Sequence, residues 1–240
     1  PDYILIFTSD GNLFWLKVHE IPQAGRHTKG RPIVNLVNMG QEEKVTTVVP
    51  VREFKEGRFV VMATMQGKIK KTPLTAFSNP RKAGIISITL EKGDKLIGSV
   101  LSDGQDEICM ATASGKAIRF NEKGIRPMGR SAQGVRGINL RKGDKVVGMV
   151  KAAPGGTLLS VTEKGYGKRT DFKEYRLQSR GGGGVINLKV VEKNGQVVGV
   201  LPVKDEDEVM LISKQGMVVR VAVSGISEVG RAAQGVRVIS

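Results

Sequence analysis

Apolar and polar residues alternate along this chain in short stretches that end at glycines. Short alternating stretches bounded by turn residues are typical of β-strands, and no segment keeps a helical period over a dozen residues. We therefore predict an all-β chain, in which residues 74–78 could form a single helical turn. An apolar stretch runs into a Gly-centred turn five times, and these turn glycines are Gly11, Gly67, Gly115, Gly165 and Gly216.

The turn glycines mark an internal repeat, because they lie 56, 48, 50 and 51 residues apart. A second landmark, Arg-x-x-x-Gly, occupies residues 26–30, 130–134, 180–184 and 231–235, and its glycine always lies 19 residues after the turn glycine. We call these segments the Arg loops. In the second repeat the spacing is 17, and Pro80 takes the place of the arginine, with Arg81 and Lys82 beside it. A third landmark, Gly-Asp-Lys before an apolar stretch, begins at Gly93 and Gly143.

Each repeat offers about four short strands, a number typical of the blades of a radial β architecture. The predicted repeats are residues 1–51, 52–102, 103–152, 153–203 and 204–240. No linker-like stretch interrupts them, so we predict one domain over residues 1–240. The chain opens within a strand and without an initiator Met, which indicates a fragment of a longer protein.

Charge narrows the choice of partner. The net charge is +15, which points to a polyanion such as nucleic acid. Basic residues follow the turn glycines and surround the Arg loops, whereas acids gather at the repeat junctions, as at residues 103–107 and 205–208. Since equivalent positions of a radial fold occupy equivalent places, we expect a basic band on one part of the rim and the acids elsewhere.

The composition of this band suits a phosphate backbone, because arginine contacts phosphates in a bidentate manner and glycine lets main-chain N–H groups approach them. Aromatic residues make up 5% of the chain and no recognition helix is evident, so we expect duplex DNA held by its backbone. The candidate DNA-binding residues are Arg26, Lys29, Arg31, Lys68, Lys70, Lys71, Arg81, Lys82, Lys116, Arg119, Arg130, Arg136, Lys168, Arg169, Arg180, Gly181, Gly182, Arg220, Arg231 and Arg237.

Motifs for chemistry are missing from the sequence. It contains no phosphate-binding Gly-x-x-x-x-Gly-Lys-Ser/Thr loop, and His19 and His27 stand apart from other metal-ligating residues. Cys109 is the single cysteine, which excludes an internal disulfide and fits an intracellular setting. No apolar run approaches 18 residues, so no membrane span is expected. We predict a non-catalytic chain without a metal or cofactor of its own.

Residues 21–36, 134–140 and 165–170 resemble the C-terminal domain of DNA gyrase A. The resemblance implies a β-pinwheel, a propeller-like disc of about five to six four-stranded blades that exchange strands, with duplex DNA wrapped around its basic rim. It also implies a bacterial, cytoplasmic and nucleoid-associated type IIA topoisomerase. There the N-terminal cleavage core of the same polypeptide and an ATPase subunit form a heterotetramer that uses ATP and Mg elsewhere to introduce negative supercoils.

The family carries a seven-residue box, Gln-Arg-Arg-Gly-Gly-Lys-Gly, in its first blade. Residues 178–184 read Gln-Ser-Arg-Gly-Gly-Gly-Gly and agree with it at five positions. The order of repeats, however, places this segment in the fifth blade, with the five repeats corresponding to blades two to six. Two alternatives stay open, namely the equivalent domain of topoisomerase IV and a propeller that binds an acidic protein.

Overall fold

The computed structural model describes residues 2–25, 27–40 and 42–239, whose regular structure consists of strands and short 3-10 helices. This confirms the all-β prediction. The chain divides into two compact units. Unit 1 comprises the residues up to Gly104 together with Ile125–Val135, and unit 2 comprises Gln105–Gly124 together with the residues from Arg136 onward. The single domain over residues 1–240 stays a prediction.

Every repeat begins with a β-hairpin that closes at its turn glycine. The backbone of Gly115 has a φ of 81°, which residues with a side chain rarely adopt. A Cβ at Gly115 would lie 2.2 Å from the carbonyl oxygen of Leu188, so the turn requires glycine. The hairpins are β1 (Tyr3–Thr8) with β2 (Asn12–Lys17), β4 (Phe59–Thr64) with β5 (Lys68–Pro73), β8 (Glu107–Thr112) with β9 (Lys116–Asn121), β12 (Thr157–Thr162) with β13 (Tyr166–Asp171), and β16 (Glu208–Ile212) with β17 (Val218–Ala222).

The first four repeats each add a third strand, which pairs antiparallel with the first strand of the hairpin. The register shifts at the same place in all four sheets, for example between Phe7 and Thr8 of β1 and between Val161 and Thr162 of β12. Such a bulge bends a strand locally, so the four sheets share one distortion. The third strands are β3 (Val45–Val51), β7 (Leu96–Ser102), β11 (Val146–Lys151) and β15 (Val197–Val203).

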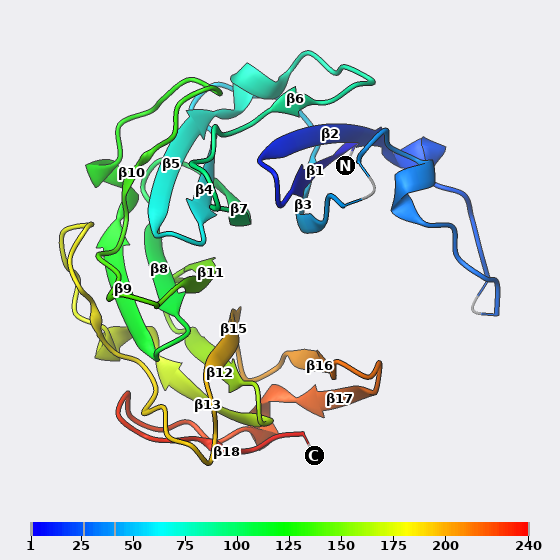
Figure 1. Ribbon diagram of the computed structural model, residues 1–240. Helices are drawn as coiled ribbons and strands as arrows, with labels where there is room; N and C mark the ends of the chain where they lie inside the picture. Colours follow the sequence, from blue (N-terminus) through cyan, green and yellow to red (C-terminus); the bar gives the residue numbers. More distant parts are fainter. Residues whose placement is uncertain (1, 26, 41, 240) are drawn as a thin grey trace. The chain divides into compact units, whose positions relative to one another are not determined.

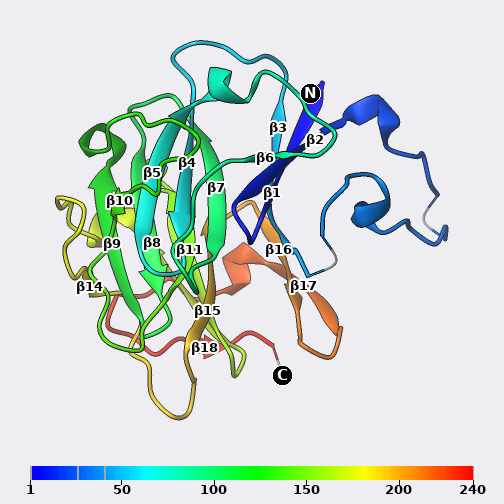
Figure 2. The same cartoon turned by 45° about the horizontal axis from the view of Figure 1, so that its top comes forward.

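The fourth strand of each sheet comes from the following repeat. Figure 1 shows β18 beside β13, and Figure 2 shows β14 beside β9. Each of these two-residue strands directly follows the last glycine of an Arg loop or of residues 80–84. Arg loops 130–134, 180–184 and 231–235 and residues 80–84 therefore lie where the chain crosses to the sheet of the preceding repeat. The exchanged strands are β6 (Ile85–Ile86) on β2, β10 (Val135–Arg136) on β5, β14 (Val185–Ile186) on β9 and β18 (Val236–Arg237) on β13.

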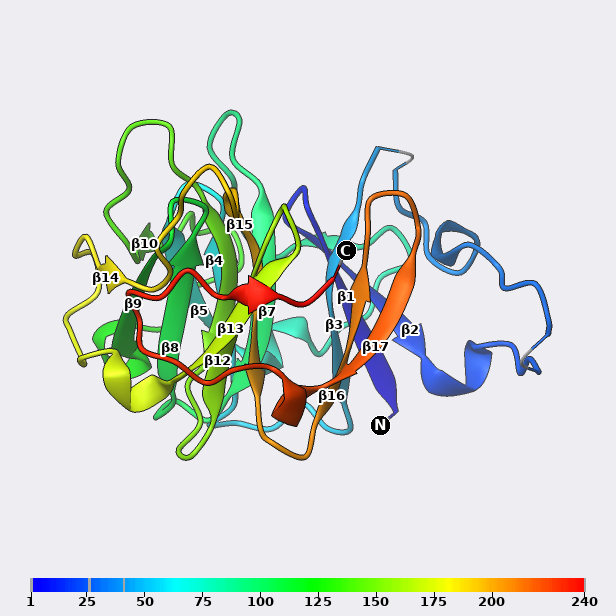
Figure 3. The ribbon, with the colours of Figure 1, turned by 90° about the horizontal axis from the view of Figure 1, so that it is seen from below.

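The fifth repeat differs from the others. In the described residues β16 and β17 form a two-stranded sheet, drawn in orange in Figure 3. The described chain therefore has four four-stranded sheets and one two-stranded sheet, where five to six four-stranded blades were expected. The reason is strand exchange, because completing the fifth sheet would need a third landmark and a following repeat, and residues 204–240 contain neither.

Each unit has its own buried apolar core. In unit 1 the alternating residues Val60 and Met62 of β4 pack with Leu5 and Phe7 of β1. In unit 2 Cys109 and Leu158 pack with Tyr175. The helical turn expected at residues 74–78 is confirmed by a 3-10 helix at Leu74–Phe77. The 3-10 helices are η1 (Val18–Glu20), η2 (Ile33–Asn35), η3 (Leu74–Phe77), η4 (Glu122–Gly124), η5 (Phe172–Glu174) and η6 (Val223–Gly225).

Candidate nucleic-acid interface

The last glycine of Arg loops 130–134, 180–184 and 231–235 seats the loop on a strand. Gly134 and Gly184 have φ values of 87° and 68°. A Cβ on Gly134 would lie 2.6 Å from the carbonyl oxygen of Ile69, and one on Gly184 would lie 2.5 Å from that of Ala117. A side chain has no room at this distance, so the motif ends in glycine for close packing. This glycine was expected to let the main chain approach a phosphate, whereas its contacts are with the neighbouring strand.

The arginine of the motif ties its loop to neighbouring backbone in unit 2. The guanidinium of Arg180 donates from Nε to the carbonyl oxygen of Gly124 at 2.9 Å and from a terminal nitrogen to that of Arg136 at 3.1 Å. Arg231 donates to the carbonyl oxygen of Ile186 at 3.1 Å. Arg136 and Ile186 are both the second residue after the last glycine of the preceding Arg loop. The two arginines are half-buried and have a structural role in addition to any role in binding.

Eight predicted basic residues lie where they can meet a ligand. Six of them are exposed, and the side chains of Lys116 and Arg130 are half-buried. Each of them follows a turn glycine, lies in or beside an Arg loop or in residues 80–84, or stands in an exchanged strand. They remain candidate contacts for a phosphate backbone. They are Lys29, Arg31, Arg81, Lys82, Lys116, Arg130, Arg136 and Arg237.

Four predicted contacts are buried and have to be corrected. Lys70 and Lys168 have no exposed surface, Lys71 is 4% exposed and Arg169 is 6% exposed. Their charged groups are used inside the protein. The ammonium of Lys71 lies 5.1 Å from the centre of the Phe59 ring, and the Nε of Arg169 donates to the carbonyl oxygen of Ile226 at 2.8 Å. A phosphate outside the protein cannot reach these groups in this conformation.

The ammonium groups of Lys70 and Lys168 are each surrounded by oxygens. Lys70 Nζ donates to the carbonyl oxygens of Ser87 at 2.6 Å and Ala132 at 3.2 Å, and also to that of Arg130. Burial, helped by the nearby Arg130, lowers the pKa of Lys70 from 10.5 to about 7. Burial likewise lowers the pKa of Lys168 to about 8, with a smaller contribution from the charge of Arg231.

Acidic residues lie beside the predicted basic ones, which corrects the expected separation of charge. Arg119 forms an ion pair with Glu107, and Arg220 forms one with Glu208. Arg169 forms one with Asp205. These arginines all stand four residues after a turn glycine, so the acids of the repeat junctions neutralise that position. Lys68 also pairs with an acid, Glu91.

The remaining predicted residues differ in standing. The N–H of Gly181 donates to the carbonyl oxygen of Gly137 at 2.6 Å, so it is occupied within the protein. Gly182 is half-buried and stays a candidate. Arg26 lies outside the described residues. Lys29 and Arg31 are exposed, but Gly30, which closes their Arg loop, has no strand atom within 4 Å of a Cβ position and no exchanged strand follows it.

Two exposed arginines were overlooked in the sequence. Arg126 and Arg176 each lie four residues before the arginine of an Arg loop, and both side chains are exposed. Their equivalence was readable from the repeat, because each lies 11 residues after its turn glycine. They lie outside the Arg loops and do not directly follow a turn glycine, so neither landmark points to them. We add them to the candidate interface.

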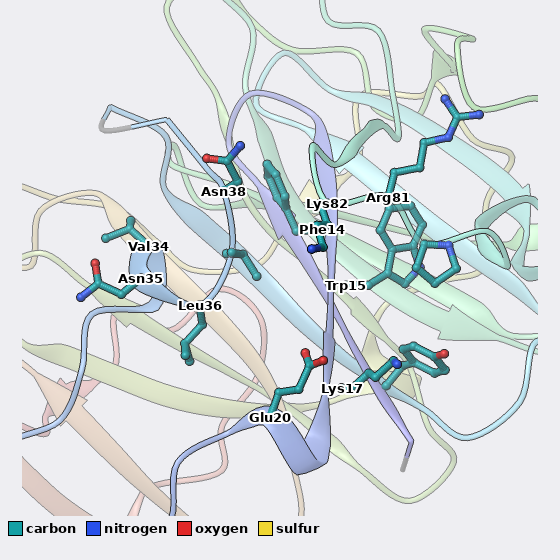
Figure 4. A pocket seen from close by; sticks show the side chains of 13 residues that line it. Phe14, Trp15, Lys17, Glu20, Val34, Asn35, Leu36, Asn38, Arg81 and Lys82 are labelled. Atoms are coloured by element: carbon teal, nitrogen blue, oxygen red, sulfur yellow. The ribbon is translucent and has the colours of Figure 1, made fainter.

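A cavity of about 530 Å³ in unit 1 adjoins two of the candidates. Phe14 and Trp15 of β2 line it together with Arg81 and Lys82 (Figure 4). The indole N–H of Trp15 donates to the carbonyl oxygen of Phe77 at 2.8 Å. The guanidinium of Arg81 extends away from the two aromatic side chains in this view, which leaves it free to face solvent.

These features define a class of protein, an all-β chain of strand-exchanging repeats with basic residues around the crossing loops. The chain belongs to the family of DNA gyrase C-terminal domains. The model of that family, described as "DNA gyrase C-terminal domain, beta-propeller", matches residues 2–52, 58–102, 106–152, 156–204 and 207–240. Each matched segment coincides with one predicted repeat to within six residues.

Several sequence relatives carry the name of DNA gyrase A. The chain is 50% identical over 238 residues to DNA gyrase A from Klebsiella oxytoca and 51% identical over 238 residues to that from Salmonella typhimurium, covering 99% of this chain and 27% of each relative. It is 49% identical over 233 residues to DNA gyrase A from Clostridium acetobutylicum, covering 97% of this chain and 28% of the relative. The chain thus spans about a quarter of the length of these curated relatives.

Solved structures agree on the fold. The C-terminal domain of DNA topoisomerase IV superposes with a TM-score of 0.91 at 26% identity, over 100% of this chain and 75% of that one. The C-terminal domain of DNA gyrase A superposes with a TM-score of 0.86 at 29% identity, over 99% of this chain and 78% of that one. The predicted β-pinwheel class is therefore confirmed. In the described residues no helix has the length and apolar character needed to cross a membrane.

Proposed function

We propose that this chain is the DNA-wrapping part of a DNA gyrase A protein. The observation that carries the proposal is the match of all five repeats to the gyrase C-terminal domain family. Exposed basic residues beside several of the crossing loops support it, because such charges can contact a phosphate backbone. Arg81, Arg136 and Arg237 are exposed examples from three different repeats.

The proposed binding mode uses charge and shape rather than base identity. The strands and short 3-10 helices of the described chain offer no long helix for the major groove. We expect phosphate contacts with little sequence preference, and specificity only through the ease with which a duplex bends. The chain itself contributes no catalytic group or cofactor in this proposal.

In the full protein we place this chain beside the N-terminal cleavage core of the same polypeptide and an ATPase subunit, in the bacterial cytoplasm and on the nucleoid. DNA wrapped on the chain would present a second duplex segment to the core. Strand passage driven by ATP would then introduce negative supercoils. The equivalent domain of topoisomerase IV shares the fold, but about 50% identity to DNA gyrase A proteins favours gyrase.

Wrapping makes duplex length the decisive variable. Bending DNA costs several kcal/mol, which has to be offset by contacts along the bend. We expect affinity, measured by mobility shift, to rise steeply as the duplex grows from roughly 10 base pairs to several times that length, and to fall with added salt. Equal affinity for short and long duplexes would rule out wrapping. Absence of binding at low salt would favour a propeller that binds an acidic protein.

Ligation of nicked circular DNA in the presence of the chain tests the handedness. A positive shift in linking number on a topoisomer gel is the result expected for gyrase-like wrapping. Binding without a shift would support the topoisomerase IV alternative.

Charge reversal tests the interface itself. A variant with Arg81, Lys82, Arg136 and Arg237 changed to Glu should lose duplex binding. The matched control changes Arg52, Lys55, Lys173 and Lys204 to Glu, four exposed residues outside the candidate set, and it alters the net charge by the same amount. Equal losses in both variants would mean that net charge, and not this interface, governs binding.

A further inference from the structure

One position in each of the first four repeats faces the loop that crosses over from the next repeat. It lies three residues after the turn glycine, on the second strand of the hairpin, where Phe14, Lys70, Ile118 and Lys168 stand in the first four repeats. A Cβ on Gly84 would lie 2.6 Å from the Phe14 ring, and one on Gly182 would lie 3.6 Å from Cδ1 of Ile118. The side chain at this position therefore decides how the crossing loop is held.

In two repeats that side chain is an ammonium group that binds the loop through its carbonyl oxygens. Lys70 donates to the carbonyl oxygens of Arg130 and Ala132. Lys168 donates to those of Gly230 at 2.8 Å and Arg231 at 2.9 Å, and to the hydroxyl of Thr170 at 3.1 Å. The shared feature is the carbonyl of the motif arginine, which both lysines bind.

Burying an ammonium group is costly, and hydrogen bonds from its donors offset part of this cost. Both lysines have no exposed surface, and each has three oxygen partners, which matches the three donors of an ammonium group. Their removal would leave buried carbonyl oxygens without these donors. Loop 130–134 would then lose the contacts that fix the direction of the exposed residues around it, such as Arg136.

In the third sheet Ile118 occupies this position, and the loop above it is the run of four glycines at residues 181–184. An isoleucine cannot donate to a carbonyl, so loop 180–184 lacks the ammonium contact that loops 130–134 and 231–235 receive. Glycine also has the largest backbone freedom of any residue. One loop of the candidate interface is therefore held differently from its two counterparts.

We infer that Lys70 and Lys168 are positioning residues that lock Arg loops 130–134 and 231–235 in the conformation that binds DNA. Loop 180–184, which contacts Ile118, keeps more conformational freedom. The inference rests on the proposed function for its consequence in DNA binding. The locking itself concerns only the free protein. Because Lys and Ile alternate at one repeat-equivalent position, the lock can be removed from one loop and added to another.

The experiment combines three variants of the whole chain, Lys70→Met, Ile118→Lys and the control Ile118→Met. Amide hydrogen exchange should become about tenfold faster in residues 128–134 of Lys70→Met while strand β4 keeps its protection. Exchange in residues 180–184 should become severalfold slower in Ile118→Lys and stay unchanged in Ile118→Met. Slowly exchanging Nζ protons in NMR spectra at pH 6 should disappear for Lys70 in the first variant and appear for the new lysine in the second.

Unchanged exchange in residues 128–134 of Lys70→Met would overturn the inference, whatever the DNA results are. If that variant does not fold, Ile118→Lys and the Nζ signals of the unmodified chain decide alone, and fast exchange of the Lys70 Nζ protons would contradict the lock. Duplex affinity is measured in parallel. We expect an about threefold to tenfold loss for Lys70→Met; wild-type chain that binds no duplex would refute the proposed function, and loosened loops with full affinity would refute the positioning role.

Discussion

Two Arg loops show how one motif is held in two ways. Loop 130–134 rests on the ammonium of Lys70, while loop 180–184 rests on the aliphatic side chain of Ile118 and on the hydrogen bonds of its own Arg180. Both end in a glycine seated on a strand carbonyl. The close approach of the last glycine to a strand carbonyl is thus common to the two loops, whereas the side chain that holds the rest of the loop differs. A repeat protein can therefore keep its topology while the rigidity of its binding loops differs from one repeat to the next.

The largest effect on stability is expected at the last glycine, which packs on a strand carbonyl in both loops. Gly134→Ala and Gly184→Ala should each lower the free energy of unfolding by about 2–4 kcal/mol, from a disfavoured positive φ and from overlap with a carbonyl oxygen. Denaturant unfolding measures the loss. Gly129→Ala is the matched control, since a Cβ there has no neighbour within 4 Å and its φ is not positive. A loss of stability in Gly134→Ala without one in Gly184→Ala would mean that the packing of the two glycines differs as well.

The position of the last glycine in each loop could be predicted from the sequence, whereas the contacts of Lys70 and Lys168 with the loops could not. A glycine recurring at a fixed distance from a turn indicates a backbone requirement, so the repeats and the crossing loops were located correctly. Lys70 and Lys168 were assigned to the DNA because basic residues recur just after the turn glycines, and lysine is usually exposed. The signal against this was the repeat itself, because Phe14 and Ile118 show that the position is apolar elsewhere. The oxygens that satisfy the lysines come from a distant loop, which no local pattern reveals.

The ion pairs of the arginines that stand four residues after a turn glycine could not be predicted from the sequence for the same reason. Arg119 and Glu107 are 12 residues apart in sequence and lie on neighbouring strands. Charge counts along the chain separated the acids from the bases, but hairpin pairing brings the two groups together. Exposed basic residues such as Arg136 stay predictions as DNA contacts.

The buried Lys70 should make the free energy of unfolding depend on pH. The pKa of Lys70 is about 7 in the folded protein and 10.5 is its ordinary value, so between these values the unfolded chain holds a proton that the folded chain has released. Stability therefore rises with pH across this window. We expect wild type to gain on the order of 1–2 kcal/mol over Lys70→Met between pH 6.5 and pH 9, measured by denaturant unfolding of both proteins.

Arg130 is the charged neighbour that contributes to this low pKa, so Arg130→Ala should raise the folded pKa of Lys70 and with it the lower limit of this pH window. Ile118→Met supplies the control for the loop without a lysine, and its difference from wild type should not change with pH. A constant difference between wild type and Lys70→Met would show that Lys70 keeps its proton throughout, and the two loops would then differ in hydrogen bonding alone.

The motif arginine should matter more where no lysine helps. Arg180→Ala removes one candidate phosphate contact and also the bonds to the carbonyl oxygens of Gly124 and Arg136, so Kd for a long duplex should rise about threefold to tenfold. Arg130→Ala should have a smaller effect, because Lys70 still holds that loop. DNA titrations at several salt concentrations separate the loss of the phosphate contact from the loss of the hydrogen bonds within the protein. Arg180→Lys keeps the charge and should retain the salt slope but not the full affinity, and equal effects of Arg130→Ala and Arg180→Ala would remove the distinction between the loops.

The smallest effect is expected inside the glycine run. Gly183 has no neighbour within 4 Å of a Cβ position and no positive φ, so Gly183→Ala introduces no clash. Alanine restricts the unfolded chain, and we expect a gain in the free energy of unfolding of about 0.4–1 kcal/mol. Gly181→Ala is the control and should be destabilising, because Gly181 has a φ of 82°. If loop 180–184 has to adjust to DNA, the more stable Gly183→Ala protein should bind a long duplex more weakly than wild type; an unchanged or higher affinity would mean that this loop needs no freedom beyond that of its lysine-held counterpart.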